Sequence, residues 1–179
     1  MSTRNSSDSA IANTTAKAFT LTRTFNAPRA LVFKAFAEAE RLAKWWGPTG
    51  FDIHVSKLEF RPGGIFHYKM AGQDGNDMWG RFTYREIIEP ERIVWINAFS
   101  NPEGDLVRAP FGMAIPLEIL NTITLEEQSG KTVLHLRSVP INATPEEQAT
   151  FDGMFESMEM GYGGTFDQLE AHLAQEPAA

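Results

Sequence analysis

The chain has 179 residues, of which 42% are hydrophobic, and this is the size and composition of one ordinary globular domain. Its 16 basic and 23 acidic residues give a formal net charge of -7, and no run rich in Lys or Arg gathers positive charge, so nucleic acid is not an expected partner. The absence of Cys excludes disulfides, a thiolate nucleophile and a thiolate zinc site.

Both ends of the sequence are predicted to be tails. Residues 1–17 are rich in Ser, Thr, Asn and Ala and lack the apolar core of a signal peptide, which indicates a disordered tail on a cytoplasmic protein. A single domain is expected over residues 18–175, followed by a short tail at 176–179. No stretch approaches the roughly 20 apolar residues that span a bilayer, so membrane insertion is not expected.

The first elements along the chain are predicted to be a strand and two short helices. Apolar residues alternate with threonines over residues 19–25, which is the period of a strand with one buried face. Asn26-Ala27-Pro28 then supplies a capping residue and a proline suited to a first helical turn. A second short helix is expected over residues 42–46.

The middle of the chain reads as antiparallel strands. Its apolar segments are separated by the turn signals Pro62-Gly63-Gly64, Asp74-Gly75, Glu89-Pro90 and Ser129-Gly130. With the first strand they make about seven strands joined as hairpins. The segments are predicted at residues 51–60, 65–71, 78–88, 92–99, 120–128 and 132–139.

A long amphipathic helix is predicted at the C-terminal end. Thr144-Pro145-Glu146-Glu147 provides an N-cap, a first-turn proline and a capping-box acid, and an apolar stripe continues from Phe151 to Leu173. One helix of about thirty residues can cross a whole sheet. The expected class is α+β, with a curved antiparallel sheet of about six to seven strands wrapped around this helix.

Several motifs in this order resemble one known family, the bacterial homologues of the activator of heat-shock protein ninety ATPase, within the START-like (SRPBCC) superfamily. The resemblance covers about residues 19–173. Many relatives have Trp where this chain has Tyr162. The motifs are Asn26-Ala27-Pro28, Lys44-Trp45-Trp46-Gly47-Pro48, Arg61-Pro62-Gly63-Gly64, Gly80, Ile115-Pro116-Leu117-Glu118, Ser129-Gly130-Lys131-Thr132 and the run Met160-Gly161-Tyr162-Gly163-Gly164.

The resemblance implies a helix-grip fold of the START-like, Bet v-like kind. Related branches bind lipids, hormones or polyketides in a cavity between helix and sheet, and the best-known members of the family act as co-chaperones. Because the shared motifs are turns and packing positions, they specify the fold strongly and the chemistry weakly.

Large aromatic and thioether side chains are the candidates for lining such a cavity. Phe66, Tyr68 and Met70 alternate along one strand and share a face. An apolar cavity with few polar groups would suit a small apolar or aromatic molecule. The complete predicted lining is Trp45, Trp46, Phe66, Tyr68, Met70, Trp79, Trp95, Phe111, Phe155, Met158 and Tyr162.

Three glycines interrupt the apolar stripe of the C-terminal helix. Gly161, Gly163 and Gly164 each cost about 1 kcal/mol relative to Ala in a helix interior. We expect close packing on a strand or a kink at these positions, or room for a ligand beneath the helix.

The segment over residues 100–119 is long, contains three prolines and still carries Leu106, Val107, Phe111, Met113 and Ile115. Loops of this length are often functional. It is expected to be either a mobile lid over the cavity or a loop packed at a homodimer interface, and both would cover these apolar groups.

Other polar patterns are interpreted structurally. The four His residues lack the spacing of a zinc site, so no metal and no other cofactor is expected. Asp152, Glu156 and Glu159 are interpreted as a solvated helix face. Gly130-Lys131-Thr132 is a hairpin turn, because Leu125 stands where a phosphate-binding loop requires glycine.

The leading functional hypothesis is a binding protein for a small apolar ligand. The first alternative is a cyclase- or hydrolase-like enzyme that uses Tyr68, His67 or Tyr162 in the same cavity, although no recognisable catalytic motif is present. The second is a co-chaperone-like protein that stimulates a heat-shock ATPase, which the resemblance alone implies.

Overall fold

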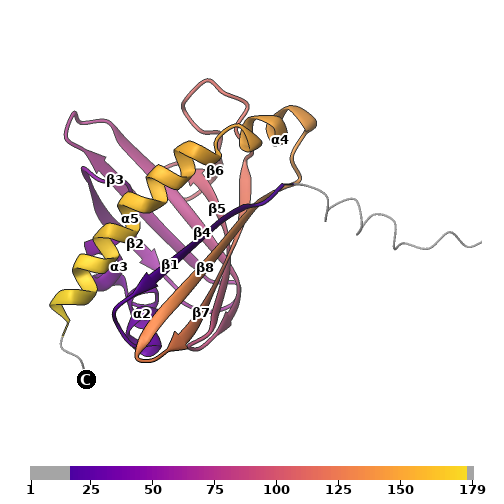
Figure 1. Ribbon diagram of the computed structural model, residues 1–179. Helices are drawn as coiled ribbons and strands as arrows, with labels where there is room; N and C mark the ends of the chain where they lie inside the picture. The colour runs from indigo at the N-terminus through magenta and orange to yellow at the C-terminus, as the bar shows by residue number, and fades with distance from the viewer. Residues whose placement is uncertain (1–16, 177–179) are drawn as a thin grey trace, which may run out of the picture.

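The computed structural model describes residues 17–176, and an antiparallel sheet dominates it (Figure 1). The strand order is β1-β8-β7-β5-β4-β3-β2, with the short β6 paired to β5. Of the tails predicted at 1–17 and 176–179, residues 1–16 and 177–179 lie outside the described residues. The strands are β1 (Phe19–Phe25), β2 (Phe51–Leu58), β3 (Ile65–Gly72), β4 (Asp77–Ile88), β5 (Arg92–Ser100), β6 (Leu106–Val107), β7 (Glu118–Gln128) and β8 (Lys131–Ile141).

Within residues 17–176, four helices complete the fold: α2 (Arg29–Ala37), α3 (Ala39–Trp45), α4 (Pro145–Asp152) and α5 (Phe155–Gln175). The first two follow β1, as the sequence predicts. Figure 1 shows α5 running diagonally across one face of the curved sheet, with α4 at one of its ends and α2 and α3 near the other. The predicted α+β helix-grip architecture is therefore confirmed.

The core lies between this face of the sheet and the helices. Period-two alternation places Phe66, Phe82 and Trp95 on the inner face of three neighbouring strands, and each is almost fully buried. Phe82 and Trp95 stack with ring centroids 5.1 Å apart. Large aromatic groups such as these each bury a large apolar area beneath the helices.

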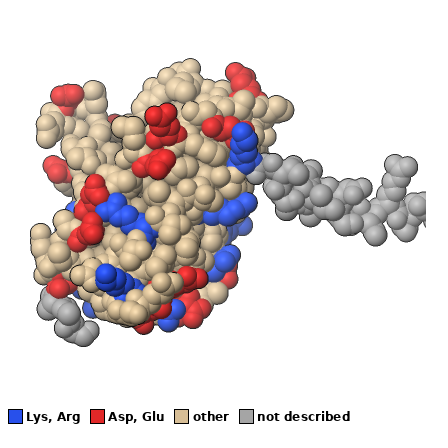
Figure 2. Space-filling view, viewed as in Figure 1, with Lys and Arg blue, Asp and Glu red and all other residues tan. Residues whose placement is uncertain are grey.

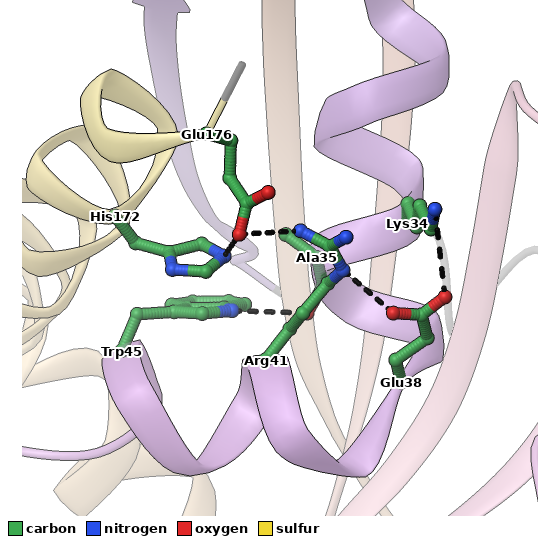
Figure 3. A network of polar contacts seen from close by, with 7 residues as sticks. All are labelled: Lys34, Ala35, Glu38, Arg41, Trp45, His172 and Glu176. Atoms are coloured by element: carbon green, nitrogen blue, oxygen red, sulfur yellow. Dashed lines mark hydrogen bonds and ion pairs between the residues drawn. The ribbon is translucent and has the colours of Figure 1, made fainter. Parts of the chain in front are cut away.

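The C-terminal half of α5 is fixed against α2 and α3 by apolar and polar contacts. Trp45 donates its indole N–H to the carbonyl oxygen of Ala35 at 3.0 Å. Arg41 forms ion pairs with Glu38 at 2.6 Å and with Glu176 at 2.8 Å, and the buried His172 lies beside the same Glu176 carboxylate (Figure 3). These residues join the end of α5 to the helical pair that follows β1.

Two sequence predictions about helix ends need correction. The predicted single helix is interrupted, because α4 ends at Asp152 with Gly153 as its C-cap, and α5 begins at Phe155 with Met154 as its N-cap. The N-cap of α2 is Pro28, which has no capping side chain, so the predicted capping role of Asn26 is wrong. The capping box is confirmed, since Thr144 accepts from the backbone N–H of Glu147 while Glu147 accepts from that of Thr144.

Segment 100–119 contains the unpredicted β6, and its apolar tip faces solvent. Phe111 is 53% exposed and Met113 is 56% exposed. The alternatives of a lid and a homodimer interface both stay predictions.

No helix within the described residues is long and apolar enough to cross a membrane.

Candidate ligand-binding pocket

A pocket of about 350 Å³ lies between α5 and the inner face of the sheet. Its floor comes from β3, β4, β5 and β7, and its roof comes from α5. One wall is the connection from α3 to β2, and the other is the end of segment 100–119. The lining residues are Trp46, Gly47, Pro48, Tyr68, Met70, Gly80, Asn97, Ala98, Phe99, Ile115, Pro116, Leu117, Ile119, Met158, Gly161, Tyr162 and Thr165.

The floor depends on the pairing of Tyr68 with Gly80 across β3 and β4. A Cβ atom at position 80 would lie 2.5 Å from both Cζ and Oη of Tyr68, which no real contact allows. Glycine therefore lets the Tyr68 ring lean over β4 and places its hydroxyl above that strand. The ring also stacks on Phe66, with the centroids 4.6 Å apart.

The roof and the first wall are joined by hydrogen bonds to one carbonyl group. Thr165 Oγ1 and Gln168 Nε2 each donate to the carbonyl oxygen of Gly47 at 2.9 Å. Gly164 brings α5 close to the same connection, because a Cβ there would lie 3.0 Å from Thr49 Oγ1. The wall at Trp46, Gly47 and Pro48 is thus fixed to the helix.

The second wall is held by an ion pair with α4. Arg108 donates to Glu147 Oε2 at 2.8 Å and approaches the Ile115 carbonyl oxygen at 3.5 Å. The backbone N–H of Thr144, followed by Arg108, holds the pKa of Glu147 below its ordinary value. The capping-box acid of α4 therefore also anchors the segment that carries Ile115, Pro116 and Leu117.

Two buried polar side chains of β7 and β8 are hydrogen-bonded to each other. Ser138 Oγ donates to Asn121 Oδ1 at 2.5 Å. Asn121 Nδ2 in turn donates to the Ile119 carbonyl oxygen at 3.3 Å. Ser138 therefore gives its only proton to Asn121.

The polar groups of the pocket are uncharged. Among residues 17–176, none that lines the pocket is Asp, Glu, His, Lys or Arg. Burial raises the pKa of Tyr162 to about 12 and also raises the pKa of Tyr68, so both phenols keep their protons at neutral pH. Charged side chains lie on the outer surface, where acidic and basic groups are interspersed on the face that carries α5 (Figure 2).

Five of the residues predicted to line a cavity border the pocket: Trp46, Tyr68, Met70, Met158 and Tyr162. Trp45, Phe66 and Trp95 are buried in the adjoining core. Phe155 packs on Phe19, with the centroids 5.7 Å apart, instead of bordering the pocket. The exposed Phe111 does not border the pocket, although its ring lies 5.7 Å from that of Phe99, which does.

Trp79 lies on the opposite face of the sheet from the pocket. Gly80, Phe82 and Tyr84 occupy the inward positions of β4, so strand alternation turns Trp79 outward, where it stacks on His67 with centroids 4.9 Å apart. His67 Nε2 lies 3.1 Å from the Asn101 carbonyl oxygen on that face. The predicted catalytic alternative that used His67 in the cavity is therefore wrong for this residue.

The glycines of α5 also differ from the expectation of close packing or a kink. A Cβ atom at Gly161 or Gly163 would meet no atom within 4 Å, and α5 is continuous through both. Only Gly164 packs closely, and it does so against the loop at Thr49. Gly161 instead forms part of the pocket rim.

Asn97, Ile115 and Leu117 border the pocket but were not predicted to do so. Alternation from Trp95 would have placed Asn97 on the inner face of β5. The lid alternative for segment 100–119 brings this segment towards a cavity, but the sequence does not single out Ile115 and Leu117, because their position depends on Arg108 reaching Glu147 in a distant helix. Within the described chain, no group of three or more His, Cys, Asp and Glu side chains could hold a metal ion.

Comparison with known proteins agrees with this architecture. The profile of the family described as Activator of Hsp90 ATPase homolog 1-like protein matches residues 26–174. No curated protein sequence matches the chain.

Solved bacterial structures share the fold. A protein from Arthrobacter aurescens superposes with a TM-score of 0.75 at 25% identity, covering 90% of this chain and 88% of that one. A protein from Nitrosomonas europaea has a TM-score of 0.69 at 27% identity, covering 89% and 96%. The AHSA1 protein from Silicibacter pomeroyi has a TM-score of 0.67 at 18% identity, covering 90% and 100%, and at this identity the likeness shows the fold alone.

Proposed function

Because this chain belongs to the Activator of Hsp90 ATPase homolog 1-like protein family and has a pocket beneath its long helix, we propose that this pocket binds a small, mostly apolar ligand. The observation that carries the proposal is the pocket of about 350 Å³ between α5 and the sheet. Small-molecule sites generally begin at about 300 Å³ and combine apolar walls with a few polar groups. This pocket has that composition.

The pocket supports binding better than acid–base catalysis. A general base must be able to lose its proton near neutral pH, but burial raises the pKa of both Tyr68 and Tyr162. No carboxylate or imidazole among the described lining residues could replace them. The co-chaperone alternative rests on the family resemblance alone and stays a prediction.

A fluorescence titration with N-phenyl-1-naphthylamine tests the proposal, because this uncharged aromatic probe becomes brighter in apolar surroundings. We expect saturable binding to the full chain. A leucine in place of Gly161 would obstruct the rim, so Gly161→Leu should weaken binding by at least about tenfold.

Gly163→Leu is the matched control, because Gly163 lies in the same helix, is equally free of close neighbours and does not border the pocket. It should bind the probe as the unmodified protein does. Equal losses in both variants, or no saturable binding at all, would contradict the proposed function.

A further inference from the structure

Tyr68 has one hydrogen-bonding capacity that the protein leaves unused. The Tyr68 hydroxyl lies above Gly80 on the pocket floor, beside the Trp46 ring. No hydrogen bond from this hydroxyl to another described residue occurs. Since Tyr68 borders the pocket, its own proton is available there.

Asn97 supplies a second unused donor on the same floor. Its side chain borders the pocket and hydrogen-bonds with no other described residue. It lies on β5 opposite Phe82, and its neighbour on the inner face, Phe99, lies opposite Gly80.

Gly80 leaves open space between the strands of these two donors. It is the β4 residue that pairs with Tyr68 of β3 on one side and with Phe99 of β5 on the other, and it has no side chain to fill that space. Because the Tyr68 hydroxyl lies above Gly80, it is directed over β4 towards β5, the strand of Asn97. Tyr162, by contrast, borders the pocket from the roof, in α5. Tyr68 and Asn97 are therefore the two free donors of the pocket floor.

We propose that the pocket selects an uncharged aromatic ligand that carries a hydrogen-bond acceptor such as a ketone oxygen, which accepts from the Tyr68 hydroxyl and the Asn97 amide. This inference rests on the proposed function and adds the ligand class to it. An anionic acceptor is disfavoured, because no cationic side chain among the described lining residues would offset the loss of its hydration.

Two probes of nearly equal shape test the inference. 2-Acetylnaphthalene carries a ketone oxygen, and 2-isopropenylnaphthalene replaces that oxygen with a methylene group. Each is titrated in competition with N-phenyl-1-naphthylamine, and 2-naphthoate serves as the anionic comparison. Tyr68→Phe should weaken binding of the ketone by about fivefold and leave the hydrocarbon within about twofold.

Asn97→Leu, which has a similar shape, is the second variant and should act in the same direction. Tyr84→Phe is the matched control, because Tyr84 is another buried tyrosine on the inner face of the sheet that does not border the pocket. It should leave the affinities of both probes unchanged.

The outcomes separate this inference from the proposed function. If Tyr68→Phe and Asn97→Leu leave the ratio of ketone to hydrocarbon affinity unchanged while the fluorescent probe still binds, the ligand class is wrong and the binding function stands. Tighter binding of 2-naphthoate than of the ketone would also overturn the uncharged class. If the unmodified protein binds none of the probes, both proposals fail.

Discussion

The two halves of α5 form one continuous helix but differ in how they pack. In the C-terminal half, Phe166, Leu169 and Leu173 are buried against the sheet and the helices α2 and α3, and Phe166 meets Phe25 at 5.9 Å. In the N-terminal half, Met158 is half-buried above the pocket, and Met160 is 75% exposed. One end anchors the helix, and the other end covers a space.

The glycines of α5 and the polar network at its end are also divided between the two halves of the helix. Gly161 and Gly163 lie in the N-terminal half, where no neighbouring atom requires them to be small. The polar network of Arg41, His172 and Glu176 closes the opposite end (Figure 3). A helix fixed at one end can leave its other end loosely packed without losing its position, which permits a pocket in a small domain.

The largest effect should come from truncating the anchored half. Phe166→Ala removes a ring that is 1% exposed and leaves an enclosed cavity, so the free energy of unfolding should fall by about 3–5 kcal/mol. Met158→Ala in the other half enlarges a space that already exists, and it should cost less than about 1.5 kcal/mol. Urea unfolding followed by Trp fluorescence measures both values. Equal losses would contradict the division between the two halves.

Helix capping at the pocket end should have an intermediate effect. Thr144→Ala removes the side-chain acceptor of the α4 capping box and should cost about 1 kcal/mol. Asn26→Ala is the control, because Asn26 caps no helix in the structure, and its cost should stay below about 0.5 kcal/mol. The two variants are compared by thermal unfolding, and a larger loss at Asn26 would restore the capping role that the sequence suggests for it.

Sequence reasoning predicts those elements that local patterns determine. Alternation gives the bounds of β1, and the hairpin between β7 and β8 follows from Ser129-Gly130, whose two residues both have positive φ. It does not predict β6, because a two-residue strand exists only through pairing with β5. The candidate site is predicted in part: Tyr68 and Met70 follow from alternation along β3.

Trp79 illustrates why one part of the predicted lining was wrong. Gly80 occupies an inward position of β4 without contributing an apolar side chain, so the alternation along this strand is broken where it would identify the inner face. Trp79, the large neighbour, then looks like the inward residue although it faces outward. The glycine that makes room for the Tyr68 ring is also the residue that hides the pattern.

A smaller effect is expected at the anchored end when the pH falls. Burial lowers the pKa of His172 from its ordinary value of 6.5, and the cations Arg41 and Lys44 oppose its protonation although Glu176 favours it. The unfolded chain therefore binds a proton at His172 more readily, so this contribution to stability is present above about pH 6.5 and is lost as the pH falls below it. Unfolding free energies at pH 7.5 and pH 5.5 should differ less in His172→Gln than in the unmodified protein. An unchanged difference would show that His172 does not report on the anchored end.

The smallest effect should come from the ion pairs at the boundary between the two halves. Arg23 on β1 meets Asp167 at 2.6 Å and Glu170 at 2.8 Å, and its guanidinium also reaches the Gly163 carbonyl oxygen at 3.4 Å. Because both carboxylates are exposed, Asp167→Asn should cost less than about 1 kcal/mol, and high salt should reduce that cost. Urea unfolding at low and high ionic strength measures the difference. A loss as large as that of Phe166→Ala would mean that charge, and not apolar burial, fixes α5 on the sheet.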